Sequence, residues 1–148
     1  MRRPDPWAEV VETCEEAVSS LVGPSWRRFD ELVSWVHGVT THHEWDELFP
    51  GAPIDVDVRR RSASAHYAAA HVPSATIFVP HGSWTAMVVV HELAHLAAPH
   101  VVGGNAMGEP SHGPTFVTAE LAILRRFVGV EAWAALRREL HAAGLNVG

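Results

Sequence analysis

The chain has 148 residues, of which 47% are hydrophobic, and its formal net charge at pH 7 is -6. This length and composition predict a single globular domain spanning residues 1–148, and they argue against a disordered chain or two full-sized domains. The acidic charge disfavours nucleic acid as a partner, because nucleic-acid binding depends on cations placed against phosphates.

No apolar run reaches the about 18 to 20 residues that a membrane span requires, and no signal-peptide stretch follows Met1. We therefore expect a cytoplasmic protein without a membrane partner. The one cysteine, Cys14, excludes an internal disulfide and a cysteine-rich zinc ribbon. A metal ion would have to be held by histidine and carboxylate side chains, and the chain has 11 histidines.

The N-terminal part of the chain is predicted to be helical. Apolar residues recur at three- and four-residue steps over residues 6–22, which is the period of one helix face, and Gly23-Pro24 ends that helix. A second helix is expected between a Ser25 cap and a stop at Gly38, followed by a short third helix over residues 41–49.

A change of period then predicts a small sheet of about three strands. Residues 54–58 alternate apolar and charged side chains, as a half-buried strand does. Residues 66–71 are predicted as a second strand. Residues 75–79 have the strongest strand composition, and Pro80 ends that run.

Helices are expected again in the C-terminal half. Residues 84–98 are apolar almost all the way round, which predicts a helix buried in the middle of the domain with Ser83 as its cap. A loop follows, and Pro114 suits the first position of the next helix. A last amphipathic helix over residues 131–143 is expected to stop at Gly144.

The predicted buried helix contains the motif His91-Glu92-Leu93-Ala94-His95. Residues four apart lie on one helix face, so His91 and His95 can reach one ion while Glu92 reaches a water on that ion. Zinc lowers the pKa of a bound water from about 15.7 towards about 7, and a nearby carboxylate can take its proton as it attacks a carbonyl. The alternative is a pair of hydrogen-bonded core histidines with Glu92 as their partner.

A catalytic zinc ion usually has three protein ligands and one open position, so a third ligand is expected further along the chain. We predict His112, just before the proline-started helix, and keep Glu120 on that helix as the alternative. His100 does not fit the metzincin spacing. Glu109 lies in a loop, where we expect it to hydrogen-bond near the site or face solvent.

The segment His112-Gly113-Pro114-Thr115-Phe116, following a His-Glu-x-x-His helix, resembles the SprT-like metallopeptidases and a related group of small bacterial metallohydrolases. The resemblance covers residues 77–124. It implies a minimal zincin-like α+β fold, with zinc on His91, His95 and His112 and with Glu92 as the general base.

Within the single predicted domain we expect a helical N-terminal part (1–50), a catalytic core (54–128) and a C-terminal helix (130–144). The resemblance also suggests that the strand over residues 75–79 borders the cleft, where an extended peptide could add on as another strand. SprT-like proteins that act on DNA-bound protein often carry a cysteine-rich ribbon or basic segments. This chain has neither, so DNA-linked proteolysis is not expected.

We therefore expect a zinc-dependent metallohydrolase that acts on a peptide or protein substrate, with Tyr67, His66, His71 or Asn105 as candidates to stabilise the oxyanion. Two alternatives stay open. The first is a regulatory, repressor-cleaving type of peptidase, in which Glu120 would be the third ligand. The second is a non-catalytic zinc-binding or partner-binding domain, in which a fourth protein ligand would close the coordination sphere.

Overall fold

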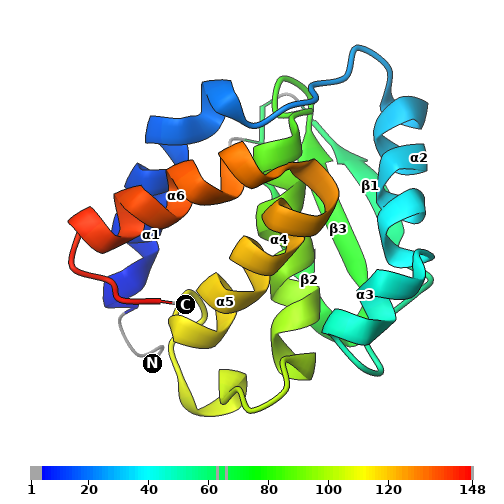
Figure 1. The fold of residues 1–148 in the computed structure, drawn as a ribbon. Helices are drawn as coiled ribbons and strands as arrows, with labels where there is room; N and C mark the ends of the chain where they lie inside the picture. Colours follow the sequence, from blue (N-terminus) through cyan, green and yellow to red (C-terminus); the bar gives the residue numbers. More distant parts are fainter. Residues whose placement is uncertain (1–4, 63, 66, 148) are drawn as a thin grey trace.

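The computed structural model describes residues 5–62, 64–65 and 67–147, and within them the predicted α+β class is confirmed (Figure 1). The helices are α1 (Pro6–Val18), α2 (Phe29–Thr40), α3 (His43–Leu48), α4 (Ala86–Ala97), α5 (Pro114–Ile123) and α6 (Val130–Ala142). The strands are β1 (Asp57–Arg61), β2 (Ala69–His71) and β3 (Thr76–Pro80). A π-helical segment, η5 (Leu124–Val128), continues α5.

The three strands form a mixed sheet in the order β1-β3-β2. β1 runs parallel to β3 in the register Val58↔Ile77, and β2 runs antiparallel to it in the register Ala70↔Ile77. Because β3 has a neighbour on each side, it is the central strand. The expectation that a peptide could add onto this strand is therefore wrong, and the edge strand that packs against α4 is β2.

Helix α4 lies in the middle of the fold, with the sheet on one side and α5 on the other (Figure 1). This position explains why α4 is apolar almost all the way round, since most of its side chains are buried. Its cap is Thr85 rather than Ser83, because the Thr85 hydroxyl accepts a hydrogen bond from the backbone N–H of Val88 at 3.4 Å. No described helix, α4 included, has the length and apolarity needed to cross a bilayer.

Helix α1 packs along α6 and also approaches the N-terminal half of α4 (Figure 1). It is shorter than predicted, because its last turn is a 3₁₀ segment, η1 (Ser19–Leu21). The aspartate before it, Asp5, caps its first turn through a hydrogen bond from the N–H of Trp7 at 3.1 Å. Glu12, Glu15 and Glu16 of this helix line a cavity together with His91 and Glu92 of α4.

Several other boundaries differ from the prediction. Helix α2 begins at Phe29 because Ser25 forms an isolated β-bridge with Thr85, and it passes through Gly38 instead of stopping there. Strand β1 begins later, at Asp57, so the alternating residues before it lead into the strand rather than forming it. Helix α5 does begin at Pro114, as predicted.

Two further boundaries concern the short second strand and the last helix. Strand β2 occupies only the end of the predicted 66–71 segment, and His66 lies outside the described residues. Helix α6 ends at Ala142, and Gly144 adopts a φ of 91°, a left-handed conformation that suits glycine after a helix. The predicted stop at Gly144 is therefore confirmed.

Candidate metal centre

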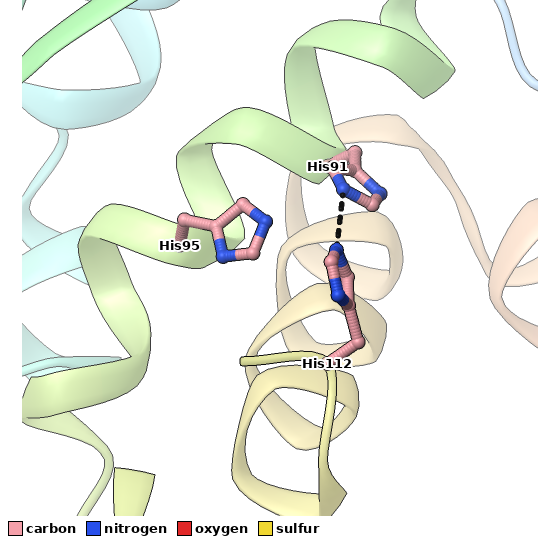
Figure 2. Close-up of side chains that lie close together, drawn as sticks. All are labelled: His91, His95 and His112. Carbon is pink, nitrogen blue, oxygen red and sulfur yellow. Dashed lines mark hydrogen bonds between the residues drawn. The ribbon is translucent and has the colours of Figure 1, made fainter. Parts of the chain in front are cut away.

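Three histidines that are separate in the sequence converge beside α4 (Figure 2). His91 and His95 come from consecutive turns of α4, and His112 comes from the loop just before α5. One ring nitrogen from each lies within 4.8 Å of the others, and the Nε2 atoms of His91 and His112 are 3.2 Å apart. The predicted ligand residues are thus brought together.

The ring of His91 is oriented by Glu15 of α1. Its Nδ1–H donates to Oε2 of Glu15 at 2.6 Å, which leaves Nε2 as an acceptor directed toward His112. Burial alone would raise the pKa of Glu15, but its contacts with Glu120 and His91 outweigh this effect and lower the pKa. Glu15 is therefore an ionised acceptor, the arrangement that commonly orients a metal-binding histidine.

His112 has an equivalent partner in Asp5, which lies 107 positions earlier in the sequence. Oδ2 of Asp5 accepts hydrogen bonds from Nδ1 of His112 at 2.7 Å, from its backbone N–H at 3.0 Å and from the Ser111 hydroxyl at 2.9 Å. Burial would raise the pKa of Asp5, but these hydrogen bonds from His112 and Ser111 lower it. The acceptor nitrogen of His112 is again Nε2.

Two acceptor nitrogens therefore meet between His91 and His112. At 3.2 Å their lone pairs repel unless a proton or a cation lies between them. Tetrahedral zinc, with Zn–N bonds of about 2.0–2.1 Å, would hold two ligand nitrogens about 3.3–3.4 Å apart. The separation and the nitrogen donor set both fit zinc.

His95 completes the cluster in an apolar setting. The Phe116 ring lies 4.5 Å from the His95 ring and 5.0 Å from both the His91 and His112 rings, measured between centroids. Burial, together with the neighbouring histidines, lowers the pKa of His95 to about 3. A neutral imidazole is the form that binds a metal. The contacts of Phe116 with all three rings explain why the segment that begins at His112 ends on an aromatic residue.

Glu92 lies beside the cluster and lines the same cavity as His91 and His112, which has a volume of about 320 Å³. Its side chain is buried, and this burial raises its pKa to about 7. A carboxyl group with such a pKa can both accept and return a proton near neutral pH. Its position and protonation therefore suit a general base.

Glu120, the alternative third ligand, lies on the other side of His91. It is fully buried, and its Oε2 is 3.7 Å from Nδ1 of His91. Among the described residues it shares a possible ligand group with Glu15 and His91, but not with His95. Burial, together with the nearby charge of Glu15, raises the pKa of Glu120 well above the ordinary value and favours its neutral, protonated form.

The other sequence candidates for ligands have separate roles. Glu109 accepts hydrogen bonds from the backbone N–H and the hydroxyl of Thr115, at 2.8 and 3.0 Å, and so stabilises the first turn of α5. His100 is in none of the possible ligand groups that the described residues form. Neither residue takes part in the histidine cluster.

Of the oxyanion candidates, Tyr67 lines the cavity that contains Glu92. His71 does not line it, and its ring nitrogen Nδ1 lies 2.7 Å from the Ser74 hydroxyl. Asn105 is also outside the lining of this cavity. His66 lies outside the described residues, so Tyr67 is the described candidate closest to the site.

Asp5 and Glu15 are the site residues that the sequence did not predict. The sequence did contain a signal for Glu15, because it follows Val11 by four positions and precedes Val18 by three, on a buried helix face. A carboxylate at such a position needs a partner. Asp5 before Pro6 is recognisable as a helix cap, but nothing local indicates that it also contacts His112.

Comparison of the chain with protein-family models, with curated protein sequences and with solved structures found no match. The resemblance to SprT-like metallopeptidases therefore stays a prediction from the motifs. The functional argument depends on the geometry of the cluster.

Proposed function

We propose that the protein is a zinc-dependent metallohydrolase that cleaves peptide bonds, with His91, His95 and His112 as ligands and Glu92 as the general base. The observation that carries this proposal is the 3.2 Å separation of two acceptor Nε2 atoms, on rings whose Nδ1 atoms both bind carboxylates. The buried Glu92 beside them supports a catalytic rather than a purely structural site.

Zinc in this position would polarise the carbonyl group of the substrate and lower the pKa of the attacking water. Glu92 accepts the proton of that water and returns it to the leaving amine as the peptide bond breaks. Asp5 and Glu15 keep the His112 and His91 rings in the orientation that ligation needs. The Phe116 ring packs against the His95 ring and supports its position.

Strand β2 begins next to this cavity and offers a backbone edge to a peptide substrate. Tyr67 and Ala68, which lead into β2, line the cavity together with His91 and Glu92. In the described sheet β2 is bonded to β3 alone, so its other edge can pair with an extended chain. We therefore assign substrate binding to the β2 edge instead of to β3.

The test compares the wild type with Glu92→Gln after reconstitution with zinc, using a mixture of internally quenched peptides. Glu92→Gln is expected to keep its zinc and to lose turnover by at least about 100-fold, because it cannot accept the proton. Glu9→Gln, which changes an exposed carboxylate of α1, serves as the matched control.

Three results would count against the proposal. Unchanged turnover in Glu92→Gln would remove Glu92 from the mechanism. Loss of zinc from Glu92→Gln would mean that this residue is a ligand. Stable zinc binding by the wild type, without turnover of any peptide, would favour the non-catalytic zinc-binding alternative.

A further inference from the structure

The cavity beside the histidine cluster has a strongly acidic wall. Helix α1 contributes Glu12, Glu15 and Glu16 to its lining, and α4 contributes Glu92. No arginine is among the described residues that line it, and the chain has no lysine. Glu15 is engaged by His91, whereas Glu12 and Glu16 are exposed.

Among the residues that the structure describes, no arginine balances the charges of Glu12 and Glu16. Neither residue forms an ion pair with any described residue. They are four positions apart on one helix, so their like charges lie about one turn apart and repel each other. Within the described residues the charge of Glu12 acts on the His91 ring, but no arginine forms an ion pair with either glutamate.

A zinc ion in the cluster would not neutralise them. Its two positive charges are matched by the carboxylates of Asp5 and Glu15, which bind the ligand rings. Ionised Glu92 adds a further negative charge when it acts as a base. The cavity would thus stay negative with its metal bound. The electrostatic field of such charges is stronger in a partly enclosed cavity than on an open surface.

We propose that Glu12 and Glu16 select substrates with an arginine or lysine side chain close to the cleaved bond, an inference that rests on the proposed function. Both residues are within one helical turn of Glu15, which contacts His91, so the long side chain of a bound peptide can reach them. Tyr67 lines the same cavity, and an aromatic ring suits a cationic side chain.

Exposed Glu9 lies on the same helix but does not line the cavity. If acidic residues on α1 served only as a solvated helix face, Glu9, Glu12 and Glu16 would be equivalent toward a peptide. If Glu12 and Glu16 form a recognition site, only these two will affect the binding of a cation. This difference makes Glu9 the internal control.

Binding can be measured without turnover. Zinc-loaded Glu92→Gln protein is titrated into fluorescein-labelled, N-acetylated peptides that carry either arginine or its neutral isostere citrulline at one central position. We expect the arginine peptide to bind about fivefold more tightly at low salt, with the difference shrinking as ionic strength rises. Adding Glu12→Gln and Glu16→Gln should abolish the difference. Adding Glu9→Gln together with Glu31→Gln, which changes an exposed residue of α2 outside the cavity lining, should preserve it.

Cleavage by the wild type separates this inference from the proposed function. If cleavage depends on Glu92 but the arginine and citrulline peptides have equal kcat/KM, the charge selection is overturned and the proposed hydrolase function is retained. If the arginine peptide binds more tightly through Glu12 and Glu16 but no peptide is cleaved, the proposed hydrolase function is overturned and the recognition site is retained. Equal binding of the two peptides by the Glu92→Gln protein would overturn the recognition site.

Discussion

Nε2 of His91 and Nε2 of His112 lie 3.2 Å apart, although each ring already donates its Nδ1–H to a carboxylate. Without a metal ion, a proton has to lie between these two acceptors. Burial alone would lower the pKa of His91, but the hydrogen bond from its ring to Glu15 outweighs this effect and raises the pKa. The metal-free cluster therefore retains a proton that zinc must displace.

Zinc binding is accordingly predicted to release about one proton from the cluster near neutral pH, and zinc affinity should rise with pH. Because the pKa of His91 is raised, this rise should extend to higher pH than for an ordinary histidine site. Isothermal titration of zinc into the metal-free protein, in buffers with different ionisation enthalpies, measures the proton release. A buffer-independent heat would contradict the shared-proton arrangement.

The third ligand can be tested by changing His112 and, as a control, His100 at the end of a 3₁₀ segment after α4. Loss of a residue that only hydrogen-bonds to a metal ligand lowers metal affinity about 10- to 100-fold. His112→Ala removes a ligand itself, so it should lower zinc affinity by more than this. His100→Ala, outside the described ligand groups, should leave affinity unchanged. Competition with a chromophoric chelator measures the zinc affinity of both variants. If His112→Ala binds zinc as tightly as the wild type, His112 is not the third ligand.

The two carboxylates that orient the rings make a separate prediction. Glu15→Gln and Asp5→Asn should each weaken zinc binding about 10- to 100-fold, because the amides lack the charge that fixes and polarises the imidazole. Asparagine keeps the oxygen that caps α1 but places a donor where Oδ2 accepts three hydrogen bonds, so Asp5→Asn should also lower the thermal stability of the metal-free protein.

The matched control for these two variants is Glu9→Gln, which removes a charge from α1 without touching a histidine. Its zinc affinity should equal that of the wild type when measured by the same chelator competition. If all three variants lost affinity equally, the effect would come from the overall charge of the helix. The specific roles of Asp5 and Glu15 would then be wrong.

Local patterns were sufficient to predict much of the site. The four-residue spacing of His91 and His95 on an apolar helix requires that both side chains share one face. The proline after His112-Gly113 marks the start of α5, so the position of His112 at a helix entrance also follows from the sequence. These inferences depend only on helix geometry, which adjacent residues determine.

The remaining features depend on contacts between distant parts of the chain. The bonds from Asp5 to His112 and from Glu15 to His91 join residues 107 and 76 positions apart, and no periodicity reports such a contact. Strand order has the same origin, because β3 follows β2 in the chain but lies between β1 and β2 in the sheet. The error about the peptide-binding edge came from this order.

Glu120 allows a test of the buried charges that does not involve the metal. Burial keeps its pKa well above the ordinary value of about 4.3, so the folded chain holds a proton that the unfolded chain loses at lower pH. By linkage, the free energy of unfolding should fall as pH rises above about 4.3, by up to about 1.4 kcal/mol per pH unit, until the folded pKa is reached.

Glu120→Gln replaces this neutral acid with a neutral amide of similar shape and removes the titration. Relative to the wild type, the stability of the variant should therefore increase with pH, whatever its absolute value. Urea unfolding at pH 5, 7 and 9 with a chelator present measures this difference, and the exposed Glu16→Gln provides a control without such a trend. A difference between Glu120→Gln and wild type that stays constant with pH would show that Glu120 is ionised in the folded protein. In that case its charge, only 3.7 Å from Nδ1 of His91, would compete with Glu15 for that ring.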